Sequence, residues 1–260
     1  MSARGWLRSS ARDHAYDVIA QEHRTEEPQG GPCPTCGEHR PYGHVPRGPA
    51  CECDRQREGE LIAEYEREHV SEFVDRVLAE ADIPRRYAEC SFDGFKLRKG
   101  TEEAFTATKA WAEAFTLDTD CGLSFFGEFG SGKTHLAVAA LRRAIKGSLV
   151  DGKYVSAGDL VGKVRGGSGI NWTPVEDAIR AELLVLDDLG MEAGTDFTRD
   201  VVARVLFGRY EAARPTIVTS NHGPAAITRL FGGGITSRLR EMTDTIVLKA
   251  TDYRAEKRAS

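Results

Sequence analysis

Short apolar runs alternate with amphipathic stretches from about residue 100 to the C-terminus. The runs are too short for helices and rich in β-branched and aromatic residues, so they predict strands. Fully apolar strands separated by helices are typical of a parallel sheet that is covered on both faces. The pattern therefore predicts an α/β fold with strands near 123–127, 153–156, 183–188, 215–221 and 245–248, and helices near 101–115, 135–145 and 198–213.

A long helix is expected ahead of this region. Between residues 54 and 82, apolar residues recur at three- and four-residue spacing with charged residues between them, and Pro84 ends the pattern. The apolar stripe fits either ordinary packing or a face that binds a partner. A shorter helix is expected at 11–23, followed by a Pro- and Gly-containing break at 25–32.

Charge and hydropathy exclude some classes of protein. The formal net charge of −5 argues against coating nucleic acid through bulk positive charge, although it leaves room for a local basic groove. The longest apolar runs, such as 183–186, are too short to span a bilayer. The N-terminus carries arginines without an apolar signal core, so we expect a cytoplasmic protein with no membrane contact.

A phosphate-binding motif lies between the first predicted strand and the helix that follows it. Residues 127–134 read GEFGSGKT and match G-x-x-x-x-G-K-[ST]. Glycines allow backbone N–H groups to close around phosphate oxygens, and the following helix presents its positive end. Lys133 would supply charge for the β- and γ-phosphates, and Thr134 a hydroxyl for Mg²⁺. A chance match would not require this strand–loop–helix setting, so the motif predicts ATP and Mg²⁺ as ligands.

Polar residues end two of the later predicted strands. Asp187 and Asp188 follow an apolar run, which would bring their carboxylates to the sheet edge beside the phosphates. Asp187 would hold Mg²⁺ and Asp188 would orient the attacking water. Asn221 would position water near the γ-phosphate, unless it only initiates a turn. Arg238 would stabilise transition-state charge on a neighbouring subunit's nucleotide, unless it is a surface arginine of an amphipathic helix.

These elements, in this order and spacing, resemble the AAA+ ATPases. More narrowly, they are similar to the DnaC/DnaI-type helicase loaders and to the IstB-type transposition helpers. The phosphate loop alone is widespread, whereas its combination with IPRRY and SRL is fairly specific. The resemblance covers about residues 83–254, and its motifs lie at 83–95, 127–137, 183–190, 215–221, 237–241 and 246–254.

The resemblance implies roles for individual residues. It assigns nucleotide and Mg²⁺ binding to the phosphate loop, the acidic pair to Asp187 and Asp188, a sensor role to Asn221 and an arginine finger to Arg238. Few residues follow TDYR at 251–254, which implies a core that lacks the C-terminal helical lid, and hence slow hydrolysis. The nucleotide-binding set is Gly127, Glu128, Phe129, Gly130, Ser131, Gly132, Lys133, Thr134 and His135.

The function implied by the resemblance is ATP-dependent loading of a hexameric replicative helicase onto single-stranded DNA, with self-assembly on the helicase. Two alternatives stay open: an IstB-like helper that remodels DNA for a transposase, and a nucleotide-binding adaptor with little hydrolysis. In loaders the region corresponding to 157–181 contributes to DNA binding, which suggests phosphate contacts by Lys163 and Arg165 and base stacking by Trp172. A solvated helix with a packed tryptophan is the rival interpretation.

Four of the six cysteines cluster near the N-terminus. Cys33, Cys36, Cys51 and Cys53 form C-x₂-C and C-x-C pairs, and without an export signal such clustering favours metal over disulfides. Four thiolates would complete a structural Zn²⁺ site, in which His39 or His44 is an alternative ligand. Four free thiols on a loose loop are the rival interpretation. DnaI-like loaders have a similar layout with an N-terminal zinc module. Cys90 and Cys121 are expected to be small buried residues.

We therefore expect three regions. Residues 1–55 would form the N-terminal segment with the zinc module, residues 56–98 a helical linker, and residues 99–260 the ATPase domain.

Overall fold

The computed structural model describes residues 14–15, 18, 52–166, 169–190 and 195–253. The chain divides into two compact units, Met1–Arg76 and Val77–Ser260. Most of the helix predicted at 11–23 and most of the cysteine cluster lie outside the described residues. The three-region division with boundaries at 55 and 98 stays a prediction.

The first unit contains most of helix α2, Glu52–Glu80, which confirms the long helix predicted from the sequence. Leu61 on this helix packs with Ala15, and Val18 and Ile62 adjoin that contact. Tyr65 and His69 stack one turn apart with ring centroids separated by 3.8 Å. The apolar stripe of this part of α2 is therefore at least partly occupied by packing within its own unit.

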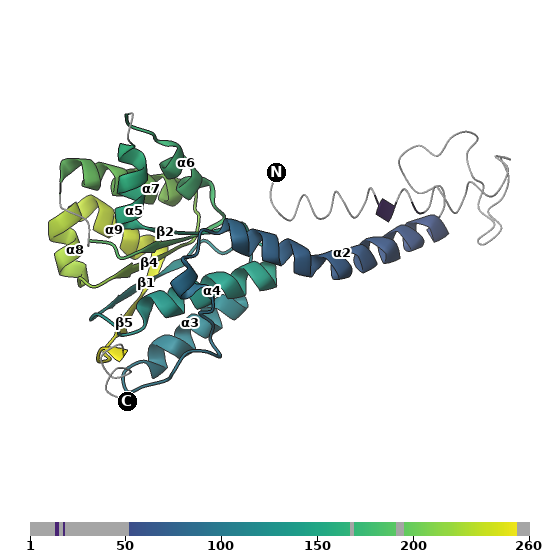
Figure 1. Cartoon of the computed structure of the whole chain (residues 1–260), viewed down its shortest axis with the longest axis horizontal. Helices are drawn as coiled ribbons and strands as arrows, with labels where there is room; N and C mark the ends of the chain where they lie inside the picture. Colours follow the sequence, from purple (N-terminus) through teal and green to yellow (C-terminus); the bar gives the residue numbers. More distant parts are fainter. Residues whose placement is uncertain (1–13, 16–17, 19–51, 167–168, 191–194, 254–260) are drawn as a thin grey trace. The chain divides into compact units, whose positions relative to one another are not determined.

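The second unit is built on a five-stranded sheet in the order β2-β3-β4-β1-β5 (Figure 1). Every neighbouring pair of strands is parallel, which confirms the predicted α/β fold. The three central strands β3, β4 and β1 are almost wholly buried because helices cover both faces. The strands are β1 Gly122–Gly127, β2 Gly152–Ser156, β3 Leu183–Asp187, β4 Thr216–Ser220 and β5 Thr243–Leu248.

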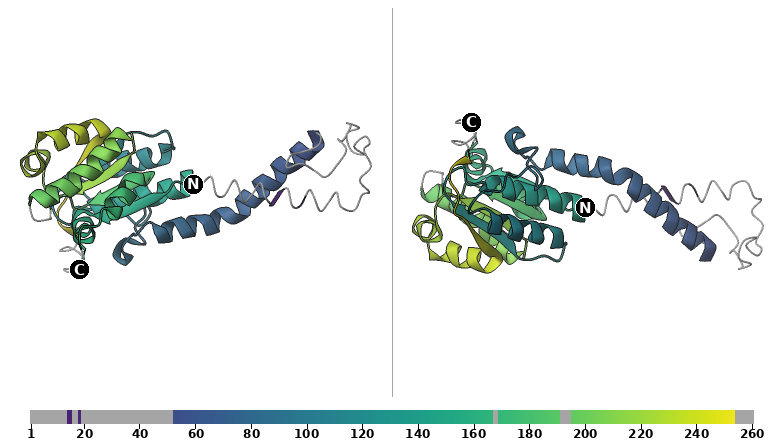
Figure 2. Two further views of the ribbon diagram at one scale, coloured as in Figure 1. Left: turned by 90° about the horizontal axis from the view of Figure 1, so that it is seen from above. Right: turned by 90° about the horizontal axis from the view of Figure 1, so that it is seen from below.

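Two layers of helices enclose the sheet. Helices α3 and α4 lie on one face, and α5 to α9 lie on the other, as the views in Figures 1 and 2 show. The second layer contributes the larger hydrophobic core, in which side chains from α5, α6, α7, α8 and α9 pack against the strands. The helices are α3 Glu102–Ala114, α4 Lys133–Ser148, α5 Ala157–Arg165, α6 Thr173–Arg180, α7 Asp196–Glu211, α8 Pro224–Phe231 and α9 Gly233–Met242.

The parallel arrangement brings the carboxyl ends of all five strands to one edge of the sheet. Strand β4 lies between β1 and β3, so the residues that follow these three strands are neighbours in space although they are distant in sequence. At the outer edge, the amide of Tyr154 on β2 donates a hydrogen bond of 2.8 Å to the carbonyl of Ala81, just after α2. Among the described residues, no helix is both long enough and apolar enough to cross a membrane.

Candidate nucleotide-binding site

The phosphate loop joins β1 to α4 and depends on glycine at defined positions. Gly130 has φ of +69°, and a Cβ there would lie 1.7 Å from Oδ1 of Asp252. The carbonyl of Gly130 accepts a hydrogen bond of 3.1 Å from the amide of Tyr253. The segment after β5 therefore packs directly on the loop and leaves no space for a side chain at position 130. Helix α4 begins at Lys133, so its first N–H groups lie at the loop.

The side chain of Lys133 is held inside this loop. It is only 5% exposed, and Nζ donates to the carbonyls of Gly127 and Glu128 at 2.8 Å each. Nζ also donates to Oδ1 of Asn221, at 2.8 Å, from the end of β4. The ammonium group is thus fixed beside the loop, and its position depends on the neighbouring strand as well as on the loop.

Asp187, the last residue of β3, is the most enclosed acid of the site, with 1% of its surface exposed. Its Oδ1 accepts hydrogen bonds from the hydroxyls of Thr134, at 2.9 Å, and Thr219, at 2.6 Å. Its Oδ2 accepts one of 2.6 Å from the hydroxyl of Tyr154. Burial, together with the negative charge and hydrogen bond of Asp187, raises the pKa of Tyr154 well above its ordinary value. Tyr154 is therefore a neutral donor to the carboxylate.

Asp188 turns away from the strand with φ of +56°, a left-handed conformation that Asp tolerates better than most residues. Its amide donates to the hydroxyl of Thr219 at 3.0 Å. Its Oδ1 lies 3.4 Å from Nδ2 of Asn221. Asn221 therefore lies between Lys133 on one side and Asp188 on the other. Its sensor role stays a prediction.

Thr134 and Asp187 offer a donor set that suits Mg²⁺. Both supply oxygen atoms, which this hard cation prefers, and their side chains already lie 2.9 Å apart at the start of α4. A hydroxyl and a carboxylate, with phosphate oxygens and waters completing the shell, are the usual protein contribution at nucleotide sites. The residues present therefore fit the expected metal ion.

The remaining loop residues differ in what their side chains do. Ser131 is buried with Oγ 3.4 Å from Lys133 Nζ, whereas Glu128 and Phe129 are exposed. His135 does not face the loop, because its Nε2 lies 2.8 Å from the carbonyl of Ser91. Its ring also packs edge-on against Phe95. His135 therefore connects α4 to the segment before α3.

Arg238 lies on α9, away from the phosphate loop of its own chain. Its guanidinium group lies 4.4 Å from the ring centroid of Phe207 and 5.4 Å from that of Tyr210, both on α7. The hydroxyl of Tyr210 donates to Glu241 at 2.9 Å. An aromatic surface thus supports Arg238 and leaves it partly exposed. The arginine-finger role of Arg238 stays a prediction.

The three residues suggested for DNA binding make different local contacts. Lys163 lies 3.9 Å from the carboxylate of Asp82, which also pairs with Lys153. Trp172 is partly buried and lies 4.4 Å beneath the guanidinium group of Arg204. DNA binding by this region stays a prediction.

Arg165 and Trp172 both lie beside a residue of α7. Arg165 lies over Phe197, and the Phe197 ring centroid is 6.4 Å from that of Trp172. Phe197 therefore lies beside both Arg165 and Trp172.

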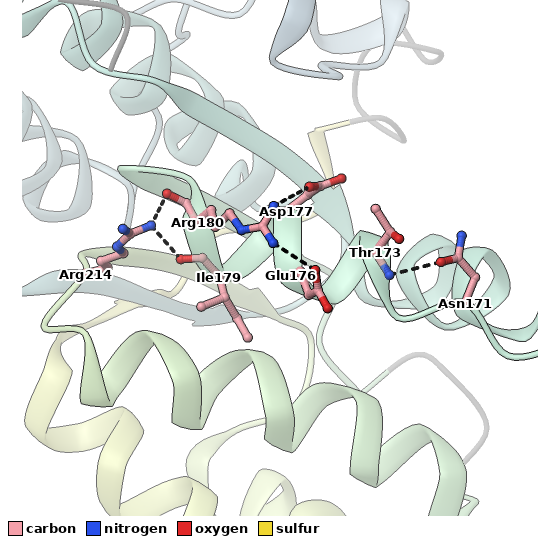
Figure 3. Close-up of polar contacts among 7 residues, drawn as sticks. All are labelled: Asn171, Thr173, Glu176, Asp177, Ile179, Arg180 and Arg214. Carbon is pink, nitrogen blue, oxygen red and sulfur yellow. Dashed lines mark hydrogen bonds and ion pairs between the residues drawn. The ribbon is translucent and has the colours of Figure 1, made fainter. Parts of the chain in front are cut away.

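Figure 3 shows how the polar groups of α6 are used locally. Oδ1 of Asn171 accepts from the amide of Thr173 at the start of the helix. Arg180 pairs with Glu176, at 2.8 Å, and with Asp177. These contacts engage the basic residue of α6 with acids of its own helix.

The structure also shows important residues that motif analysis missed. Two of them are Tyr154 and Thr219, which bond to Asp187. A third is Arg209 on α7, which is fully buried and whose guanidinium group donates to the carbonyls of Ala178, Ala181 and Pro215. Burial lowers the pKa of Arg209 to about 9. Arg209 fastens the end of α6 to the start of β4, which supports the strand that carries Asn221. A hydroxyl or guanidinium group within an apolar pattern gives no sequence signal of such a contact.

The cysteine positions can be described only in part. Cys33, Cys36 and Cys51, with His39 and His44, lie outside the described residues, and Cys53 falls in the first turn of α2. The zinc site stays a prediction. Cys90 and Cys121 are half-buried free thiols rather than fully buried ones, and burial raises the pKa of each.

Comparison with known proteins identifies the family. Residues 69–258 match the IstB-like ATP binding proteins, and this range includes every residue of the site described above. The chain belongs to the IstB-like ATP-binding family. ATP binding by this family agrees with the phosphate loop and acidic pair, and it confirms the resemblance seen in the sequence.

Relatives of this IstB-like protein have named functions. It is 28% identical over 195 residues to the replicative helicase loader DnaC of Buchnera aphidicola subsp. Acyrthosiphon pisum, covering 71% of this chain and 77% of that one. It is 24% identical over 186 residues to DnaC of Escherichia coli K12, covering 68% and 74%. These alignments extend far beyond the phosphate loop.

Solved structures agree with the fold. A crystal structure of the DnaC helicase loader superposes with a TM-score of 0.59 and 26% identity, covering 64% of this chain and all of that one. A DnaI structure gives a TM-score of 0.56 at 23% identity, with 66% and 94% covered, and is evidence for the fold alone. The sheet of this IstB-like protein is thus that of a DnaC-type AAA+ domain.

Proposed function

We propose that this protein is an ATP-dependent loader that places a hexameric replicative helicase on single-stranded DNA. The observation that carries the proposal is the 195-residue similarity to a DnaC loader, which covers 71% of the chain. The assembled site supports it, because Lys133, Asn221 and Asp187 meet at one edge of the sheet as an ATP-driven switch requires.

Nucleotide binding would use the loop and the start of α4. Backbone N–H groups and the helix N-terminus would hold the phosphates, and Lys133 would neutralise β- and γ-phosphate charge. Lys133 donates to two loop carbonyls and to Asn221, so binding would exchange part of this hydrogen bonding for phosphate oxygens. The resulting shift of the Lys133 ammonium group would change its hydrogen bond to Asn221, and through Asn221 the contact with Asp188.

Hydrolysis would depend on the residues that follow β3 and β4. Thr134 and Asp187 would hold Mg²⁺, which neutralises charge on the β- and γ-phosphate oxygens when it is bound. Asp188 would polarise the attacking water and Asn221 would orient it. The hydrogen bond between Asn221 and Asp188 would keep these two groups in register.

Arg238 would act on the nucleotide of a neighbouring subunit once the protein has self-assembled on the helicase. In its own chain it is supported by Phe207 and Tyr210 and lies on a different element from the phosphate loop. Turnover by the isolated chain would then be slow, because the cation that stabilises transition-state charge arrives only on assembly. ATP would serve as a timer for helicase release.

The other parts of the chain would engage the partners. A Zn²⁺ ion held by Cys33, Cys36, Cys51 and Cys53 would order the N-terminal module that contacts the helicase. Arg165 and Trp172 would contribute a phosphate contact and a stacking surface for single-stranded DNA. The protein would act in the cytoplasm, where replication takes place.

A transposition helper is the second candidate, since the family that matches is named for IstB-like proteins. The two functions differ in the protein that is bound. We expect a pull-down with the tagged chain to capture the replicative helicase of the same genome when ATP is present. Capture of an IS21-type transposase instead, with no helicase retained, would favour the transposition helper.

A further inference from the structure

Tyr154 occupies a position at the site that no motif predicts. Strand β2 pairs with β3 so that Tyr154 lies opposite Val185 and Ser156 lies opposite Asp187. Residues two apart on a strand point to the same face, so Tyr154 and Asp187 are diagonal neighbours on one side of the sheet. A tyrosine side chain is long enough to bridge this diagonal. Its hydroxyl lies 2.6 Å from Oδ2 of Asp187.

We infer that Tyr154 is a positioning residue for the Mg²⁺ site: its hydroxyl fixes the carboxylate of Asp187 in the orientation that the metal requires. The inference rests on the proposed nucleotide site and deepens it. Asp187 has two oxygen atoms, and Thr134 and Thr219 both bond to Oδ1. Tyr154 is therefore the partner that defines the other oxygen and limits rotation of the carboxylate.

The surroundings of Tyr154 make this contact rigid. Its side chain is 4% exposed and Asp187 is 1% exposed, so both partners are largely removed from water. Its amide is fastened to the carbonyl of Ala81, and its ring lies 6.3 Å from that of Tyr87. A carboxylate can only accept hydrogen bonds, so the phenol hydroxyl must be the donor.

The alternative is that the buried tyrosine hydroxyl only satisfies its hydrogen bonding and contributes to stability, with no role in metal binding. The two interpretations predict different effects of removing the hydroxyl on Mg²⁺ affinity. Groups that orient a metal-binding carboxylate typically change metal affinity by 10- to 100-fold when they are removed. A purely structural hydroxyl would lower stability, and it would affect nucleotide binding equally with and without Mg²⁺.

The test is calorimetric titration of the full-length protein with ADP, over a series of Mg²⁺ concentrations and in EDTA. For Tyr154→Phe we expect ADP binding in EDTA to stay within about twofold of wild type. We expect the Mg²⁺ concentration for half-maximal tightening to rise about tenfold. Tyr65→Phe, which removes a phenol hydroxyl from α2 in the other unit, should match wild type in both conditions.

A second measurement protects the test against misfolding of the variant. Urea titration without ligand shows whether Tyr154→Phe unfolds cooperatively, and its ADP affinity in EDTA shows whether the rest of the site is intact. An unchanged Mg²⁺ requirement in folded Tyr154→Phe, or an equal loss in EDTA and Mg²⁺, would overturn the inference. If wild type itself shows no Mg²⁺-dependent ADP binding, the proposed nucleotide site is wrong as well.

Discussion

Replacing Lys133 by alanine removes the cation that the loop holds ready for the phosphates. Its ammonium group is almost completely buried and donates to carbonyls of the loop and to Asn221. A hydrogen bond to a charged group contributes about 1.5–3 kcal/mol, and Lys133 would reach both the β- and γ-phosphates. We therefore expect a loss of about 3 kcal/mol of ATP binding energy, or about a hundredfold in Kd.

Thermal unfolding with and without Mg²⁺ and ATP measures this loss. At an ATP concentration well above both dissociation constants, ligand stabilisation falls by the full loss of binding free energy. For a domain of this size, 1 kcal/mol corresponds to about 2–4 °C in Tm, so the rise in Tm caused by ATP should shrink by about 6–12 °C. Using the difference between liganded and free protein cancels any change that the substitution makes to the free protein.

Lys109 on α3 provides the control for Lys133. It is an exposed lysine, and Lys109→Ala removes the same charge without touching the loop. Lys109→Ala should show the wild-type rise in Tm with ATP. If Lys133→Ala also shows the wild-type rise, then Lys133 does not bind phosphate and the site assignment is refuted.

Three further predictions concern assembly, metal and stability. Arg238→Ala should bind ATP normally but lose at least tenfold in the ATPase rate of the assembled complex, whereas Arg240→Ala keeps it; full activity of Arg238→Ala would place the arginine finger elsewhere. Metal analysis should find about one Zn²⁺ per chain, lost in Cys33→Ser and retained in Cys90→Ser, and metal-free wild-type protein would remove the zinc claim. Arg209→Met should lower the free energy of unfolding by about 3–5 kcal/mol in urea titration, because it leaves several buried carbonyls without a donor; an unchanged midpoint would contradict this.

The sheet and the main site residues follow from sequence because each has a local signal. Strand β3 is an apolar run that ends in acids, and β1 leads into a glycine-rich motif. Both strands, and the functional residues at their ends, can therefore be predicted from the sequence. Parallel strands bring Asn221 to the same sheet edge as Lys133 and Asp188, but its place between them also requires that β4 lie between β1 and β3, an order that the sequence pattern does not give.

The contacts that complete the site had no such signal. Tyr154 reads as one more apolar residue of a strand, and its bond to Asp187 depends on the pairing register of β2 with β3. Arg209 reads as a charge on a helix, yet the fold buries it completely. His135 follows the phosphate motif in sequence but turns toward Ser91, because a helix directs successive side chains to different faces. Such contacts are set by tertiary packing and not by the local pattern.

Helicase loading is tested most directly by an assay on circular single-stranded DNA without free ends. The replicative helicase of the same genome is incubated with this protein and ATP, and helicase retained on the DNA is measured after gel filtration. We predict that wild-type protein with ATP raises the retained helicase several-fold, and that Lys133→Ala does not. Equal retention of helicase with and without the wild-type protein would contradict the proposed function.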